Sequence, residues 1–200
     1  MRNEAKCDQA INKAMQLFWQ KGYAGTSMRD LQVALDMRPG SIYASLGDKD
    51  TIFLRALLRY REDTKQQLSS IFTQADDVNT GLLTGIHFLV FSEGDIPSQH
   101  CFMVKTLSEL ETNSPRLVEA AQSGLADMRS ILAGQIALVL GSDESDSHSY
   151  ELAGVIQAQI IGLKTVMAID RSIVEAKQDL RFMLATILPE LFDEQQKIRH

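Results

Sequence analysis

The fold of this 200-residue chain depends on residues 26–49, TSMRDLQVALDMRPGSIYASLGDK. Ser27, followed three residues later by Asp30, predicts a capping box at the start of a short helix. Pro39 favours a second helix start and disfavours helical geometry at the residue before it, so a tight turn is expected at residues 36–38. The stretch therefore predicts two short helices joined by a turn of three residues.

Helices are also predicted on both sides of this stretch. Apolar residues at steps of three and four predict a first helix that stops near Gly22, and Asp48 is placed to cap a long helix. Further helical patterns follow at residues 79–93, 99–111, 115–140, 149–169 and 173–192. No segment has the alternation of a strand. The sequence predicts an all-α chain with a three-helix domain at residues 1–47 and a helical bundle at residues 48–200.

Charge is divided unequally between the two parts of the chain. The net charge is −6, but residues 1–65 carry eleven Lys or Arg against eight Asp or Glu, while residues 66–200 carry nine against eighteen. An excess of positive charge in the first part of an otherwise acidic protein indicates that this part contacts a polyanion.

Composition argues against several protein classes. The 44% hydrophobic and 23% charged content is that of a globular protein. No run approaches the roughly 18 uncharged apolar residues of a membrane span, and the N-terminus lacks a secretory signal, so we expect a cytoplasmic protein with no membrane partner. The two cysteines, Cys7 and Cys101, match no zinc spacing. No phosphate loop is present, and Glu109 and Glu111 diverge on a helix, so we expect no metal, no cofactor and no catalytic residue.

The two short helices have the spacing of a helix-turn-helix, in which the second helix enters the major groove of DNA. The residues of the second helix expected to face the bases are small: Gly40, Ser41, Ala44 and Ser45. Tyr43 adds a flat ring with a hydroxyl that can reach a phosphate. Side chains expected along the DNA backbone are Thr26, Ser27, Arg29, Arg38 and Lys49. The alternatives are that Tyr43 belongs to the core and that Arg38 and Lys49 are ordinary solvated charges.

Five pieces of the sequence resemble the N-terminal domain of TetR/AcrR-type transcriptional regulators, in order and at that family's spacing: Ala14–Phe18, Gly22-Tyr23, Thr26–Leu31, Gly40–Tyr43 and Gly47–Asp50. The resemblance implies an all-helical homodimer that binds a short palindromic operator through residues 27–49. It also implies that residues 48–200 form an effector-binding and dimerisation domain, and that a small molecule entering it releases the operator. Leu46 departs from the family's usual Phe. Ala44 and Ser45 stand where larger polar residues are common, which leaves the base preference open.

The predicted helix at residues 149–169 is apolar nearly all round, so it must be buried on two faces. Gly154, Ala158 and Gly162 recur every fourth residue and would let a second helix approach closely. Together with the last helix, this predicts a four-helix interface across a twofold axis. The expected interface residues are Gly154, Ala158, Ile161, Gly162, Phe182, Met183 and Ile187.

A sensing cavity is expected among the helices between residues 79 and 169. Its candidate wall mixes aromatic and sulfur-containing side chains with a few polar groups, as ligand pockets do: His87, Phe88, Phe91, Cys101, Phe102, Leu107, Met128, Gln135 and Gln157. Each of these could equally be a core residue. The long helix from Asp48 joins the DNA-binding part to the rest of the chain. A ligand that favours one tilt of this helix would therefore change the distance between the two helix-turn-helix units of the homodimer.

Other functions fit the same sequence. The DNA-binding protein could be regulated by a protein partner, or by oxidation or electrophilic modification of Cys101, although a cysteine among Phe102, Met103 and Val104 is more often a buried apolar residue. An unrelated helical enzyme is the remaining class, and it would need titratable residues that converge in a cleft.

Overall fold

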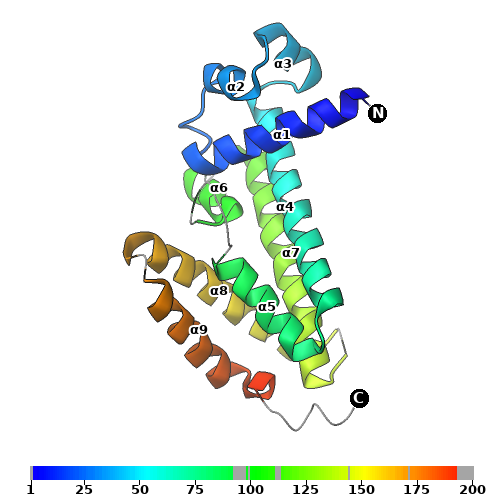
Figure 1. Ribbon diagram of the computed structural model, residues 1–200, viewed down its shortest axis with the longest axis vertical. Helices are drawn as coiled ribbons and strands as arrows, with labels where there is room; N and C mark the ends of the chain where they lie inside the picture. The colour runs from blue at the N-terminus through cyan, green and yellow to red at the C-terminus, as the bar shows by residue number, and fades with distance from the viewer. Residues whose placement is uncertain are drawn as a thin grey trace. The chain divides into compact units, whose positions relative to one another are not determined.

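The computed structural model describes residues 2–91, 98, 100–110, 114–143, 145–170 and 172–192, and these residues contain helices and no strand (Figure 1). The α-helices are α1 (Arg2–Lys21), α2 (Met28–Leu35), α3 (Pro39–Ser45), α4 (Lys49–Gln74), α5 (Val78–Phe91), α6 (Phe102–Leu110), α7 (Pro115–Leu140), α8 (Ser147–Asp170) and α9 (Ile173–Ile187). A 3₁₀ turn, η1 (Pro189–Phe192), follows α9. The predicted all-α class is confirmed.

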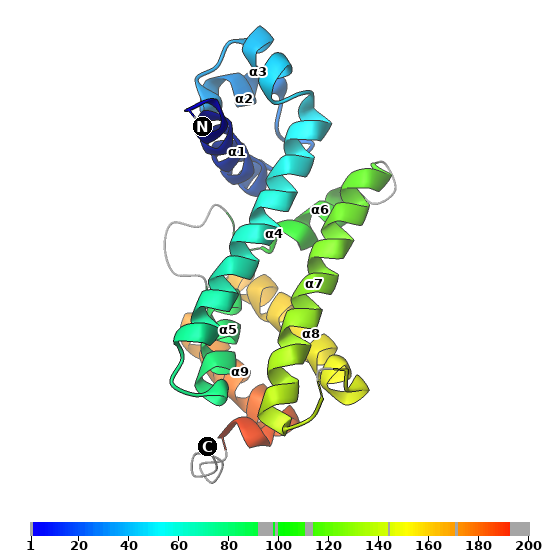
Figure 2. The same cartoon turned by 90° about the vertical axis from the view of Figure 1, so that its right-hand side faces the viewer.

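The chain folds into two compact units. The first contains residues 1–64 and 101–125, and the second contains residues 65–100 and 126–200. The long helices α4 and α7 each contribute residues to both units (Figure 2). These packing units do not test the boundary predicted between residues 47 and 48, which stays a prediction about the DNA-binding domain.

The core of the first unit is a cluster of aromatic rings on three helices. Phe53 of α4 meets Phe18 of α1 edge-on at 4.7 Å between ring centroids, and it meets Phe102 of α6 at 5.4 Å. Tyr60, two turns further along α4, packs against Phe102 at 5.7 Å and against Trp19 at 5.2 Å. These contacts hold α1, α4 and α6 together, and α2 and α3 rest on them through Leu31 and Ile42, which are fully buried.

The second unit is built from α5, α8, α9 and the ends of α4 and α7. Its core contains Leu82 and Ile86 of α5, Ile156 of α8 and Leu180 of α9, all without measurable exposure. The buried ammonium of Lys164 on α8 donates to the carbonyl oxygens of Leu89 (3.1 Å) and Val90 (3.4 Å) at the end of α5. A cation at this position is favoured because the last carbonyls of a helix carry partial negative charge.

Two predicted helix boundaries in the C-terminal half are wrong. The helix expected at residues 173–192 ends at Ile187, and Leu188 leaves helical geometry with φ −144° and ψ 65°. Pro189 explains this, because proline disfavours helical geometry at the residue before it. The helix expected to begin at residue 99 begins at Phe102. Residues 92 and 93, at the predicted end of another helix, lie outside the described part of the chain, as do residues 97, 111 and 113.

Helices α7 and α8 are long, apolar helices that the sequence analysis did not consider as membrane spans. By length and composition alone, Pro115–Leu140 and Ser147–Ile169 are both apolar enough to cross a membrane. Core helices of globular proteins pass the same test, and α8 buries one face, which includes Ile156 and Lys164, inside the second unit. Its opposite face is apolar and exposed in the single chain.

Candidate nucleic-acid interface

Helix α2 begins with the predicted capping box. The backbone N–H of Asp30 donates to Ser27 Oγ at 3.1 Å, and the backbone N–H of Ser27 donates to the Asp30 carboxylate at 2.9 Å. Hydrogen bonds from Ser27 and then Lys21 hold the pKa of Asp30 well below its usual value. The helix ends at Asp36, which is in the left-handed region at φ 52°. Both predicted ends of α2 are therefore confirmed.

Helix α3 presents one face to solvent and anchors the other. Ile42 is fully buried and Leu46, which follows the helix, is 2% exposed. The guanidinium of Arg55 on α4 donates to the carbonyl oxygen of Ser45 at 3.3 Å, which ties down the end of α3. The four residues predicted to face the bases are exposed, and so is Tyr43, which was predicted to reach a phosphate: Gly40, Ser41, Ala44, Ser45 and Tyr43. Tyr43 is 56% exposed, so the alternative that it belongs to the core is wrong.

The five residues predicted along the DNA backbone differ in accessibility. Ser27, Arg29 and Arg38 are exposed, and Lys49 is half-buried. Thr26 is fully buried, and its hydroxyl donates to the carbonyl oxygen of Gly22 at 2.7 Å. Thr26 therefore stabilises the turn before α2, and the expectation that its side chain reaches a phosphate is wrong.

Lys49, the first residue of α4, lies against an aromatic ring. Its ammonium is 4.0 Å from the centroid of the Tyr23 ring. The hydroxyl of Tyr23 donates to the Asp50 carboxylate, and burial and then this hydrogen bond raise the pKa of Tyr23 to about 12. The arrangement places a cation at the junction of α4 with the turn that leads into α2.

Two charged side chains of α6 hold the turn between α1 and α2, and the sequence analysis missed both. The carboxylate of Glu109 accepts the backbone N–H groups of Tyr23 (2.8 Å) and Ala24 (2.6 Å). One helical turn earlier, the ammonium of Lys105 donates to the carbonyl oxygens of Trp19 (2.9 Å) and Gln20 (2.8 Å) at the end of α1. Their spacing of four residues was the available signal, since it places both on one face of a helix.

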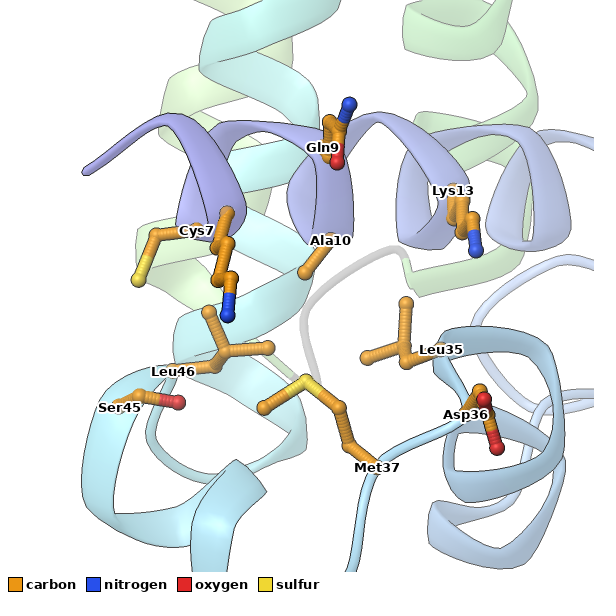
Figure 3. Close-up of a pocket in the computed structure, with 10 residues that line it drawn as sticks. Cys7, Gln9, Ala10, Lys13, Leu35, Asp36, Met37, Ser45 and Leu46 are labelled. Carbon is orange, nitrogen blue, oxygen red and sulfur yellow. The ribbon is translucent and has the colours of Figure 1, made fainter. Parts of the chain in front are cut away.

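A cavity of about 340 Å³ lies within the first unit, between α1, the end of α2 and the end of α3 (Figure 3). Ala10, Leu35 and Leu46 form an apolar part of its wall, and the Met37 side chain extends between Leu46 and Leu35. Leu46 is the position at which the family pattern usually has Phe. Leu46 is itself 2% exposed, so an apolar side chain is kept in the core at this position.

The predicted effector residues divide between the two units. Phe102 belongs to the buried aromatic core of the first unit at 1% exposure, so its expected role in a ligand wall is wrong. Cys101 and Leu107 are half-buried in the same unit. The other candidates, His87, Phe88, Phe91, Met128, Gln135 and Gln157, lie in the second unit.

Two of the effector candidates in the second unit lie side by side. The rings of His87 and Phe91 have their centroids 5.2 Å apart, and Lys177 of α9 extends over Phe91. Burial and then the charge of Lys177 lower the pKa of His87. In the first unit, the hydroxyl of Tyr60 donates to Cys101 Sγ at 3.8 Å. The ring pair remains a candidate for a ligand wall, and Cys101 remains open as core or sensor.

Most of the residues predicted for a dimer interface lie on an exposed surface of the second unit. Phe182 is 77% exposed, and Ala158 and Gly162 are exposed, while Ile161, Met183 and Ile187 are half-buried. Gly154 is different, because the guanidinium of Arg129 lies where its Cβ would be, at 2.7 Å. The same Arg129 donates to the carbonyl oxygen of Tyr150 at 3.0 Å. Gly154 is half-buried and packs against Arg129 within its own chain, so its place in an interface stays a prediction.

Comparison with known proteins identifies a family that the N-terminal part of the chain matches. The family model described as "Bacterial regulatory proteins, tetR family" matches residues 10–56, which contain α2, α3 and the start of α4. The HTH-type transcriptional repressor ComR of Escherichia coli (strain K12) is 31% identical over 120 residues, which is 58% of this chain and 56% of that protein. Residues 10–56 therefore carry the domain that this tetR family model describes.

Solved structures of TetR-family proteins share the fold over nearly the whole chain. A TetR-family transcriptional regulator from Cytophaga hutchinsonii has a TM-score of 0.80 at 18% identity and covers 94% of this chain and 95% of its own. The reduced form of E. coli NemR has a TM-score of 0.76 at 19% identity, covering 92% and 96%. A cysteine mutant of CifR complexed with 26bp operator DNA has a TM-score of 0.70 at 24% identity, covering 92% and 94%.

The curated relative and the solved structures support different statements about this chain. The chain spans little more than half the length of the curated repressor that it matches. The solved structures, all below 25% identity, show the fold. The matched family model is described as regulatory proteins and the curated relative as a transcriptional repressor, so both favour a regulator over the enzyme considered from sequence alone.

Proposed function

We propose that this chain is a cytoplasmic transcriptional repressor that binds a palindromic operator as a homodimer. The observation that carries the proposal is the form of α3, which buries Ile42 and exposes Tyr43 together with four small residues. Small residues let a helix approach base edges closely in the major groove, which is about 12 Å wide. The fold supports the proposal as well, because CifR of the same fold is complexed with operator DNA.

The homodimer is supported by the exposed apolar side chains of α8 and α9. Besides Phe182, these include Ile169 at 82% exposure, and Val155, Val166, Ile173 and Val174. Several large apolar side chains left exposed on two helices of a globular protein indicate an interaction site. A second copy of this chain is the partner proposed for this surface, because the two helix-turn-helix units of a homodimer match a palindrome. Its half-sites would lie about 34–36 Å, or a multiple of this, apart.

Release of the operator is proposed to follow effector binding in the second unit. Helix α4 supports this, since residues up to Thr64 belong to the unit that contains α3 and residues from Lys65 onward belong to the other. A small molecule that binds one orientation of α4 more tightly shifts the population toward it. His87 and Phe91, whose rings lie together, are the proposed part of the effector wall.

Modification of Cys101 is a second candidate for regulation. The thiol is half-buried and accepts a hydrogen bond from Tyr60, so an added group would disturb the aromatic core beside it. Treating the purified protein with N-ethylmaleimide should then weaken operator binding, while Cys101→Ser should be unaffected by the reagent. Equal loss of binding in both proteins would assign the effect to Cys7 or to another group, and no loss in either would exclude this regulation.

The proposed function is tested by selecting bound fragments from the source genome. We expect the selected fragments to share a palindromic sequence. Tyr43→Ala should weaken binding to such a fragment about tenfold, because a hydrogen bond to a charged phosphate is lost. Tyr43→Phe, which removes only the hydroxyl, separates this hydrogen bond from contacts of the ring. Because Tyr43 is exposed, both variants should melt at the wild-type temperature; unchanged affinity in both would remove Tyr43 from the interface.

A further inference from the structure

The ammonium of Lys49 is held at one place by an aromatic ring. It lies 4.0 Å from the centroid of Tyr23, a residue of the turn between α1 and α2. A cation at this distance is attracted to the negative face of the ring. The contact links the first residue of α4 to a turn that lies 26 positions earlier in the sequence.

The Tyr23 ring is itself fixed on several sides. It packs edge-on against Phe53 of the core, with ring centroids 5.1 Å apart and an angle of 89° between the planes. Its hydroxyl donates to Asp50, and its backbone N–H donates to Glu109 at 2.8 Å. Burial and then the hydrogen bond to Asp50 raise the pKa of Tyr23 to about 12, so the hydroxyl keeps its proton for this bond well above neutral pH. The ring is therefore a rigid support for a flexible side chain.

The acidic residues beside Lys49 are occupied by other donors. Asp48 accepts the backbone N–H of Thr51 at 2.9 Å, and Asp50 accepts the hydroxyl of Tyr23. Within the described residues, Lys49 forms an ion pair with neither of them. Neither carboxylate therefore holds the Lys49 ammonium in an ion pair, and the ammonium can still meet an external anion.

We propose that Tyr23 is a positioning residue that holds the Lys49 ammonium ready to bind a DNA phosphate, and that Asp50 keeps Tyr23 in place. This inference rests on the proposed function, in which Lys49 contacts the DNA backbone. A lysine side chain has many rotamers in solution, and ordering it on binding costs free energy. Because the Tyr23 ring already orders the Lys49 side chain before DNA binds, part of that conformational entropy is not lost on binding.

The test combines nuclear magnetic resonance with DNA binding on the full chain. In the wild-type protein, the methylene protons next to the Lys49 ammonium should be shifted upfield by the Tyr23 ring, and Tyr23→Leu should remove that shift. Binding is measured to a mixed-sequence DNA duplex at low salt, where phosphate contacts dominate the affinity. The variants are Tyr23→Leu, Tyr23→Phe, Lys49→Ala and the double variant Tyr23→Leu/Lys49→Ala.

Tyr23→Leu should weaken duplex binding about two- to fivefold, and the same substitution in the Lys49→Ala background should change it little. Tyr23→Phe, which keeps the ring, should retain most of the affinity. Lys49→Ala should reduce the slope of log affinity against log salt by about 0.9, whereas the exposed control Lys65→Ala should leave it unchanged.

Each adverse result has a distinct meaning. If Tyr23→Leu weakens binding equally with and without Lys49, Tyr23 acts independently of the lysine and the proposal is overturned. An unshifted Lys49 methylene signal in the wild-type protein overturns it as well, and this measurement needs no variant and no DNA. If the wild-type protein fails to bind any duplex while the upfield shift is present, the proposed DNA-binding function fails although the positioning contact exists.

Discussion

Phe182→Glu is expected to convert the proposed dimer into a monomer and to weaken operator binding about a hundredfold or more. Phe182 is 77% exposed on α9, one of the two helices of the proposed interface. Placing a carboxylate there puts two like charges close to the twofold axis and leaves them without partners in an apolar contact. The loss in affinity follows because a monomer binds one half-site, whereas a dimer binds two at high effective concentration.

Sedimentation at micromolar concentration measures the oligomeric state, and fluorescence anisotropy measures the operator affinity. Leu138→Glu is the matched control, because Leu138 is 52% exposed on α7 and lies outside the proposed interface. The control should remain a dimer with wild-type affinity. A wild-type protein that sediments as a monomer, or a Phe182→Glu protein that stays dimeric, would remove α9 from the interface.

Glu109→Ala is expected to lower the free energy of unfolding by about 1–3 kcal/mol. The substitution removes the acceptor of two backbone N–H groups, those of Tyr23 and Ala24, at 2.8 Å and 2.6 Å. Hydrogen bonds to a charged acceptor are among the stronger ones in proteins. Because this turn leads into α2 and carries Tyr23, operator binding should weaken together with stability.

Urea denaturation measures the effect on stability. Glu119→Ala on α7 is the control, since Glu119 is an exposed glutamate and should cost less than about 0.5 kcal/mol. Glu109→Gln should fall between the two, because its amide keeps one oxygen acceptor and turns an N–H toward the other donor. Stability unchanged by Glu109→Ala would show that water replaces the carboxylate at no cost.

The parts of the fold that sequence predicted are those determined by neighbours along the chain. The capping box joins residues three positions apart, and Pro39 acts on its own helix start, so α2, α3 and the turn between them were predictable. The outward position of the small residues of α3 also follows from helical periodicity, whereas the exposure of Tyr43 had been left open between DNA contact and core. The end of α9 was predictable as well, from Pro189, and was missed.

The parts that sequence did not predict depend on contacts between distant segments. The spacing of Lys105 and Glu109 places both on one face of α6, but their partners lie 85 or 86 positions away, and no local pattern reveals those partners. Phe102 looked like a ligand residue because aromatic rings serve both pockets and cores, and only its contact with Phe53 assigns it to the core. Gly154 fits a close-packing pattern, yet the group it accommodates is the side chain of Arg129.

The proposed function depends most on the recognition of specific DNA bases by α3. The direct measurement is the affinity of the wild-type protein for a fragment selected from its genome, compared at physiological salt with a mixed-sequence duplex of equal length. We expect the selected fragment to bind at least about 10³-fold more tightly. Equal affinity for the two duplexes would contradict the account.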